Sequence, residues 1–161
     1  MRARWIRFGA IEPLEFEAAV TALAAVQGSA AEPVLAWSQA ERQYLFALVA
    51  PRKRAPGRAA RWSSWGLAAA VATYRQFGYA AYLDEQGIWL YGRRIGDARV
   101  QKIGECAVIA SSFMLRFPEA CVITPSQELE QAFRLRLEAQ HGWQFDHSWP
   151  SAPETARYAL A

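Results

Sequence analysis

The 161-residue sequence has few of the residues that build metal sites, disulfide frameworks or membrane spans. Its two cysteines, Cys106 and Cys121, and two histidines, His141 and His147, occur without the CxxC or HExxH spacing of a metal centre. The cysteines also lack the partners of a disulfide framework, so we expect reduced thiols. The sequence therefore indicates no metal, and it points to no particular cofactor.

Long apolar runs are missing as well, since none approaches the roughly eighteen residues that cross a bilayer. Glu12 and Glu15 interrupt the N-terminal segment too early for a signal peptide. A composition of 53% hydrophobic and 20% charged residues is sufficient for a buried core. We therefore predict one soluble, cytoplasmic domain over residues 1–161, with no membrane contact and an oligomeric state that the sequence leaves open.

Acidic residues are absent between Glu41 and Asp84, although the net charge of the whole chain is only +3. Five basic residues gather within this acid-free stretch: Arg52, Lys53, Arg54, Arg58 and Arg61. They lie among two prolines and a glycine, which predicts a basic surface loop over residues 51–61. The loop has three interpretations: a solvated mobile segment, a contact for an anion or an acidic protein, or a contact for nucleic acid.

Alternating and helical hydrophobic patterns predict an α+β domain. The strands are expected over residues 4–9, 33–38, 42–50, 79–83, 88–91 and 107–117, while residues 97–106 fit either a strand or an irregular approach to one. Helices are expected from Pro13, from Ser63 or Ser64 as a cap, and from Thr124, whose sequence Thr-Pro-Ser-Gln resembles a capping box. On the first helix the predicted buried stripe is wide and includes Leu14. Residues 143–161 are expected to form an irregular C-terminal tail.

The middle of the chain contains Gly92-Arg93-Arg94-Ile95-Gly96, predicted as a turn, followed by a strand that includes Ala110-Ser-Ser-Phe-Met-Leu115. This order resembles the catalytic domain of lipoate- and biotin-protein ligases and octanoyltransferases, in which a Gly-Arg-Lys-Ile turn precedes a His-Gly-Ser/Thr strand. Gln86-Gly87 stands where that family has Asn-Asp, and the N-terminal helix begins Pro13-Leu14 as in lipoate ligases. The resemblance implies a mixed or antiparallel sheet covered by helices, as in class II synthetases. It also implies a ligand site at Gly92, Arg93, Arg94, Gly96, Ser111 and Ser112.

Two departures from the family pattern bear on activity. Arg94 stands where the family has a lysine that contacts the acyl carbonyl and the phosphate of the acyl-adenylate. Arginine keeps the charge, but its flat guanidinium does not deprotonate near neutral pH. The family also carries an Arg-Arg-x-x-Gly-Gly-Gly-Ala-Val-x-His segment between its hairpin and the following helix, and residues 51–61 leave no room for it. The resemblance is therefore to a truncated and degenerate member.

Two residues are candidates for covalent chemistry. Cys121 precedes a predicted helix whose N-terminus would lower the pKa of its thiol, although a buried structural cysteine fits the same position. Lys102 follows Arg94 by eight residues and would reach the same pocket if the chain doubles back; the alternative is a solvated lysine at a strand edge. Asp146 and His147 are adjacent on an extended segment, so their side chains should point in opposite directions.

Three function classes follow. The first is a non-catalytic relative of the ligases that binds an acyl, lipoyl or biotinyl ligand, with the basic loop and the Arg93/Arg94 turn as contacts for an acidic lipoyl or biotinyl carrier domain or a small carboxylate. The second is an active lipoyl or octanoyl transferase that uses Cys121 or Lys102. The third is a nucleic-acid-binding module, for which the sequence shows a basic stretch but neither a recognition helix nor an aromatic-lined groove. We favour the first class, with nucleic acid the least expected partner.

Overall fold

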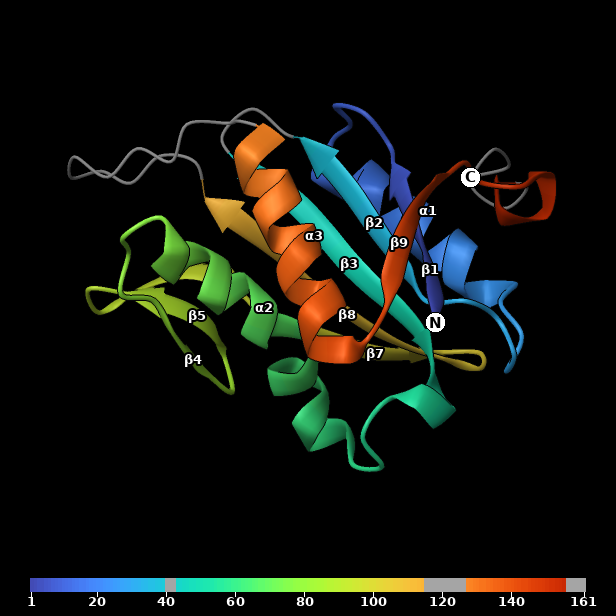
Figure 1. Cartoon of the computed structure of the whole chain (residues 1–161). Helices are drawn as coiled ribbons and strands as arrows, with labels where there is room; N and C mark the ends of the chain where they lie inside the picture. The colour runs from blue at the N-terminus through green and yellow to red at the C-terminus, as the bar shows by residue number, and fades with distance from the viewer. Residues whose placement is uncertain (40–42, 115–126, 156–161) are drawn as a thin grey trace.

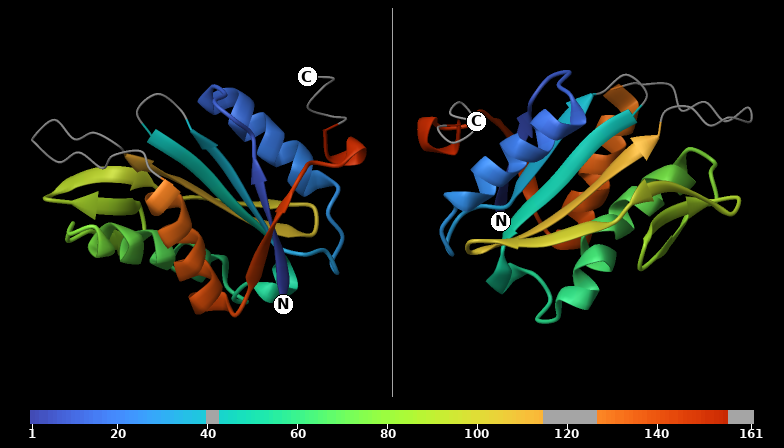
Figure 2. Two further views of the ribbon diagram at one scale, coloured as in Figure 1. Left: turned by 45° about the horizontal axis from the view of Figure 1, so that its top comes forward. Right: turned by 180° about the vertical axis from the view of Figure 1, so that it is seen from behind.

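The computed structural model describes residues 1–39, 43–114 and 127–155, and shows two β-sheets with helices on both faces of the larger one (Figure 1, Figure 2). The helices are α1 (Pro13–Ala25), α2 (Trp62–Gln76) and α3 (Gln127–His141), with short 3-10 turns η1 (Arg52–Arg54) and η2 (Ala59–Arg61). The strands are β1 (Arg2–Arg7), β2 (Val34–Gln39), β3 (Gln43–Pro51), β4 (Tyr82–Asp84), β5 (Gly87–Leu90), β6 (Arg93–Asp97), β7 (Arg99–Ile103), β8 (Cys106–Met114) and β9 (Gln144–Ser148). No helix among the described residues is long and apolar enough to span a membrane.

The larger sheet has six strands in the order β7-β8-β3-β2-β1-β9. Strand β1 runs parallel to both of its neighbours, β2 and β9, whereas the β2–β3, β3–β8 and β7–β8 pairs are antiparallel. Strands β4, β5 and β6 form a small antiparallel sheet beside the end of β8. The mixed sheet with helices packed on it confirms the predicted α+β class.

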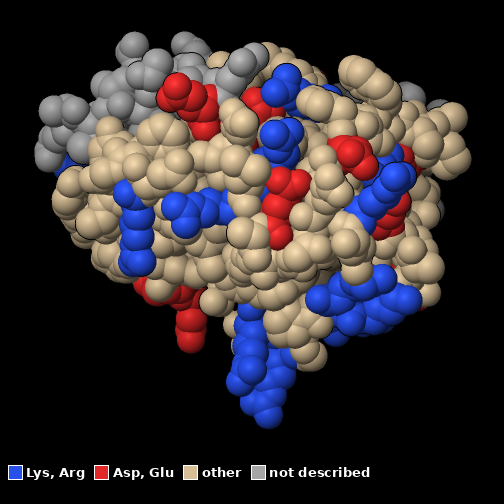
Figure 3. All heavy atoms as spheres, viewed as in Figure 1, with Lys and Arg blue, Asp and Glu red and all other residues tan. Residues whose placement is uncertain are grey.

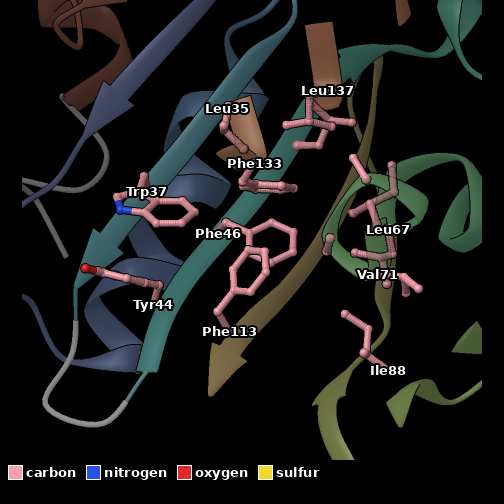
Figure 4. Close-up of a cluster of buried hydrophobic side chains, with 14 of the residues drawn as sticks. Leu35, Trp37, Tyr44, Phe46, Leu67, Val71, Ile88, Phe113, Phe133 and Leu137 are labelled. Carbon is pink, nitrogen blue, oxygen red and sulfur yellow. The ribbon is translucent and has the colours of Figure 1, made fainter. Parts of the chain in front are cut away.

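The two faces of the six-stranded sheet differ in the size of their side chains. Strand β3 alternates, as a strand buried on both sides must, with Phe46 on the face under α2 and α3 and Ala47 on the face under α1. The first face holds an aromatic cluster in which the Phe46 and Phe133 rings lie 4.7 Å apart (Figure 4). The second face has a floor of mostly small residues: Ala36, Ala47, Val49, Val108 and Ala110. Small side chains on this floor leave space beside α1.

Three local predictions are wrong. The expected turn over Gly92–Gly96 is confined to Tyr91 and Gly92, which have φ angles of 51° and 76°, and residues 93–97 form strand β6. Such paired positive φ values suit a two-residue hairpin between twisted strands, which is why the turn is so short. Helix α2 begins at Trp62 without a serine cap. Leu14 is 80% exposed, because α1 turns Phe16, Val20 and Leu23 to the sheet instead.

The prediction of an irregular tail over residues 143–161 is also wrong for the first residues of that segment. Gln144–Ser148 form β9, which pairs in parallel with β1 and places His147 beside Trp5. The segment has a single strongly apolar residue, Phe145, so its own pattern does not indicate a strand. It becomes one because β1 offers an otherwise unpaired row of backbone donors and acceptors. The capping box predicted at Thr124 lies outside the described residues.

Candidate functional site

A small, mostly apolar depression lies between α1 and the β7–β8 edge of the larger sheet. Its lining residues come from α1, β3, β7 and β8: Phe16, Glu17, Val20, Thr21, Ala47, Arg99, Gln101, Ile103, Val108 and Ala110. The floor is made by Ala47, Val108 and Ala110, the small residues that β3 and β8 direct toward α1. We call this depression the α1–β7 groove. As it stands, the groove encloses only about 20 Å³.

Arg99 closes one end of the α1–β7 groove. Its Nη1 lies 3.6 Å from Oε2 of Glu17 on α1, and its Nε lies 3.3 Å from Oδ2 of Asp97. The Nε is buried and makes no aligned hydrogen bond with any described residue, so the contact with Asp97 is electrostatic. The side chains of Arg99 and Glu17 are 39% and 47% exposed. The pair therefore joins the two walls of the groove at a place that water reaches.

The groove is lined mostly by apolar side chains, with few polar groups among them. Its described lining contains no lysine, cysteine, histidine or serine, and the Thr21 hydroxyl donates a hydrogen bond to the Glu17 carbonyl. The nearby thiol of Cys106 is fully buried, and burial, with the charge of Glu105, raises its pKa to about 11. A thiol that stays protonated at neutral pH is a poor nucleophile. The α1–β7 groove thus has a mostly apolar lining and one guanidinium, that of Arg99, which can bind an oxyanion.

The residues predicted from the Gly92–Gly96 motif are only partly brought together. Arg93 and Arg94 are exposed on β6, in the small sheet, where the charge of Arg94 is one of several influences that lower the pKa of Asp84; the largest is the hydrogen bond donated by the Trp89 indole. Neither arginine lines the α1–β7 groove. The predicted site at these two residues stays a prediction, and the structure assigns the groove's cation to Arg99.

Gly96, Ser111 and Ser112 do lie together, where β6 passes β8. A Cβ on Gly96 would lie 2.9 Å from both Ser111 Oγ and Ser112 O, so a side chain has no room at that position. Ser112 is directed to the α1 face and Ser111 to the opposite face, since it pairs with Phe46. The buried Ser111 hydroxyl has no hydrogen-bond partner among the described residues. This contact explains the glycine as a close approach of two strands.

Lys102 lies away from Arg94. It stands opposite Ala107 on β7, with its Nζ 6.0 Å from the centre of the Trp62 ring, whereas Gly96 lies beside Ser111 and Ser112 near the other end of β8. The chain does not double back, because β6 leads into β7 and both run along β8. Cys121 lies outside the described residues. Asp146 and His147 face opposite sides of β9, with His147 stacked on Trp5 at 5.8 Å.

The basic loop and the Arg93/Arg94 strand lie at opposite ends of the molecule. The loop follows Pro51, which pairs with Cys106 at the start of β8, while Gly96 lies near the end of β8. Its five basic residues, Arg52, Lys53, Arg54, Arg58 and Arg61, are all exposed. The loop and the Arg93/Arg94 strand are therefore two separate basic surfaces, and the predicted carrier-domain contact at either of them stays a prediction.

Sequence reasoning missed Arg99 and Glu17. Arg99 lies in a segment whose sequence has no clear strand pattern. Glu17 was explained by its favourable interaction with the positive end of the helix dipole. The one local signal is the alternation along β7, which places Arg99, Gln101 and Ile103 on the same face of that strand. Their meeting with α1 depends on the sheet order, which no local pattern specifies.

No protein-family model matches the chain, and no curated protein matches it by sequence; the similarities found are to solved structures. One is a bipartite lipoate-protein ligase from Thermoplasma acidophilum, described with its E2 lipoyl domain, at 10% identity and a TM-score of 0.83, covering 99% of this chain and 91% of that one. A second is lipoate-protein ligase A bound with ATP, at 11% identity and 0.77, covering 99% and 94%. A third is biotin acetyl coenzyme A carboxylase synthetase from Helicobacter pylori, at 14% identity and 0.59, covering 99% and 81%. The chain therefore has the fold of the lipoate- and biotin-protein ligase catalytic domains.

Proposed function

We propose that this chain is a non-catalytic relative of the lipoate- and biotin-protein ligases that binds a short acyl group, such as an octanoyl or lipoyl chain, in the α1–β7 groove. The observation that carries the proposal is the composition of the groove. It combines an apolar floor and mostly apolar walls with the guanidinium of Arg99 at one end, and its described lining has no lysine, cysteine, histidine or serine. Among structures with this fold, one from Thermoplasma acidophilum has bound lipoic acid and one from Helicobacter pylori has bound biotinylated ATP.

The groove must open to receive a ligand, which separates Arg99 from Glu17 and moves apolar side chains of α1 away from the sheet. Ligand pockets usually measure a few hundred Å³, far more than the 20 Å³ of the closed groove. An exposed ion pair contributes at most about 1 kcal/mol, so separating Arg99 from Glu17 is a small cost. Burying an octanoyl tail contributes roughly 0.8 kcal/mol per methylene group. Hydrophobic burial therefore outweighs the ion pair, and a ligand oxyanion takes the place of Glu17 beside Arg99.

Binding is tested by titrating octanoate, lipoate and biotin into the protein in a calorimeter. We expect octanoate to bind with a dissociation constant on the order of 0.1 mM, given the association costs that offset tail burial. Ala110→Leu fills the floor of the groove and should weaken octanoate binding at least about tenfold. Ala139→Leu makes the same chemical change on the exposed side of α3 and should leave binding unaltered. Equal affinities for the two variants would contradict binding in the groove.

The absence of catalysis is a separate question with its own test. With ATP and lipoate, octanoate or biotin, we expect no pyrophosphate release and no acyl-adenylate. Incubation with an acyl donor such as octanoyl thioester, followed by mass spectrometry, examines the alternative of an active lipoyl or octanoyl transferase. An acyl group found on Cys121 or Lys102 would establish that alternative and overturn the non-catalytic assignment.

A carrier domain is the second form in which such an acyl group is presented. One ligase of this fold is described together with its E2 lipoyl domain. We expect a lipoylated or biotinylated carrier domain to bind more tightly than the same domain without its acyl group, and Ala110→Leu to remove the difference. Titration of both carrier forms, followed by fluorescence anisotropy, measures this. Equal binding of the two forms would locate the carrier contact outside the groove.

A further inference from the structure

An open cleft of about 560 Å³ lies at the end of the molecule that carries the basic loop. It is lined by η1, the first turn of α2, the last turn of α3, the residue before β9 and the N-terminal residue: Lys53, Arg54, Trp65, Gln140, His141, Trp143 and Met1, whose ammonium group donates a hydrogen bond to the Gly142 carbonyl. Figure 1 shows η1 and the end of α3 at this same end of the fold. None of these residues lines the α1–β7 groove, so the cleft is a separate feature.

One wall of the cleft is aromatic and uncharged. His141 stacks on Trp143 with ring centres 4.3 Å apart, and Trp65 meets His141 edge-on at 4.8 Å. The Gln140 side chain donates a hydrogen bond to the Trp65 carbonyl and so fixes α3 to α2 at this point. Burial lowers the pKa of His141 to about 4, which keeps the imidazole neutral at physiological pH. The wall therefore presents packed rings, of which Trp65 and His141 are only partly buried.

The opposite wall is basic and has no acidic counterpart. Among the described residues, none of the five basic side chains of the loop forms an ion pair with a carboxylate. The loop is nonetheless anchored: the Arg52 amide donates to the Glu105 carbonyl at 2.9 Å, and the Trp62 indole donates to the Pro56 carbonyl at 2.7 Å. Figure 3 shows blue side chains gathered over this lower end of the molecule. The positive charges are thus held near the aromatic wall without being neutralised.

We propose that the cleft between the basic loop and the Trp65–His141–Trp143 wall binds single-stranded nucleic acid. A cationic wall that follows phosphates, beside aromatic rings on which bases stack, is the combination that single strands require. An acidic protein would also use the cations, whereas a single strand uses the cations for its phosphates and the ring faces for its bases. Lys53 and Arg54 line the cleft, and Arg52, Arg58 and Arg61 are exposed on the same loop, so the basic surface suits a ligand with several phosphates better than one small anion. The structure thus supplies the aromatic-lined groove that the sequence alone did not show.

The test is fluorescence anisotropy with a labelled single-stranded oligonucleotide of mixed sequence, as RNA and as DNA, titrated with the full-length chain at several salt concentrations. We expect the logarithm of affinity to fall with the logarithm of salt with a slope of about −3.5, if all five cations contact phosphate. Lys53→Ala combined with Arg54→Ala should reduce this slope by about 1.4. Arg94→Ala combined with Arg136→Ala removes the same charge outside the cleft and should alter the slope far less. An unchanged slope in the first double variant would overturn the proposal.

Stacking is tested separately from charge. Trp65→Ala should weaken binding at least about fivefold, whereas Trp65→Phe, which keeps a stacking ring and guards against loss of folding, should retain most of the affinity. Trp149→Ala removes an exposed indole elsewhere and is the matched control. Polyphosphate, ATP and a blunt duplex serve as competitors. Competition by polyphosphate as effective as by the single strand, together with no effect of Trp65→Ala, would show a general anion surface and overturn the proposal.

Discussion

At the scale of single residues, the buried carboxylate of Glu154 has several hydrogen-bond donors and one ion-pair partner. It lies 5% exposed, forms an ion pair with Arg4 (Nη1 to Oε2, 2.6 Å), and accepts a second hydrogen bond from Arg4 Nη2 at 2.8 Å. The Ser151 amide donates to Oε1 at 2.7 Å, and the Gln27 side chain donates to Oε2. Burial alone would raise the pKa of Glu154, but these donors and the charge of Arg4 lower it to about 2. The carboxylate thus joins β1, the segment after α1, and the residues after β9.

Glu154→Gln should therefore destabilise the protein in a pH-dependent way. The folded pKa of about 2 lies below the ordinary value of 4.5, so the stabilisation is complete above about pH 4.5 and is lost as pH falls toward 2. We expect the variant to lose a few kcal/mol of unfolding free energy at pH 7, and much less at pH 3, by urea denaturation. Glu128→Gln, at an exposed position on α3, should have little effect at either pH. A loss of equal size at both pH values would show that the charge of Glu154 is irrelevant.

The contrast between Arg94 and Arg99 shows why the site was predicted only in part. The motif around Arg94 is continuous in the sequence, and it predicted the fold correctly because Gly96 on β6 lies against Ser111 and Ser112 on the strand that the motif places after it, β8. The cation of the α1–β7 groove is Arg99, five residues later, because alternation on β7 turns Arg99 toward α1. A motif indicates ancestry through its order of residues. The groove depends on which face of an edge strand meets a helix distant in sequence.

At the scale of elements, helix α2 approaches β8 at Gly66. A Cβ at this position would lie 2.8 Å from Cγ2 and 2.9 Å from Cβ of Ile109, a side chain that is fully buried. Glycine in a helix costs about 1 kcal/mol relative to alanine. We infer that the close packing of α2 on the sheet, which a residue with a Cβ would prevent, stabilises the fold by more than this cost.

Gly66→Ala is predicted to lower stability even though it raises helix propensity. Overpacking typically costs 1–3 kcal/mol, against a gain of about 1 kcal/mol from propensity, so the net change should be a loss of roughly 1 kcal/mol. Thermal unfolding should show a midpoint lower by a few degrees. Ala68→Gly, at an exposed position on the same helix, measures the propensity effect alone. A Gly66→Ala variant more stable than the original chain would mean that α2 can shift away from Ile109.

Elements with a strong hydrophobic pattern of their own could be predicted from the sequence. Elements that form only through pairing with a strand distant in the sequence could not. The long run rich in aromatic and branched residues over 42–50 predicted a strand correctly, and β3 is buried on both faces inside the larger sheet. Strand β9 was missed because its pairing with β1, about 140 residues earlier, decides its conformation. Leu14 was assigned to the wrong face of α1 because the helix is rich in alanine on every side, so its pattern hardly distinguishes a buried stripe.

At the scale of the whole molecule, the fold separates the two proposed binding features by a complete layer. The α1–β7 groove lies on the face of the large sheet covered by α1, while the aromatic cleft lies beyond the ends of α2 and α3, which cover the opposite face (Figure 2). The closely packed aromatic cluster of Figure 4 lies between that face and these helices. Sites that share no residue and are separated by a well-packed core usually act independently.

This separation leads to a prediction about the two ligands together. Saturating the groove with octanoate should change the oligonucleotide dissociation constant by less than about twofold, corresponding to a coupling free energy below roughly 0.5 kcal/mol. Ala110→Leu should leave oligonucleotide binding intact, and Trp65→Ala should leave octanoate binding intact. The measurement is the anisotropy titration repeated at saturating octanoate, with acetate at equal ionic strength as the control for salt. Because both ligands are anions, mutual competition is the outcome that would contradict two sites: it would mean that octanoate binds at the basic cleft, and that the closed groove between Arg99 and Glu17 does not open.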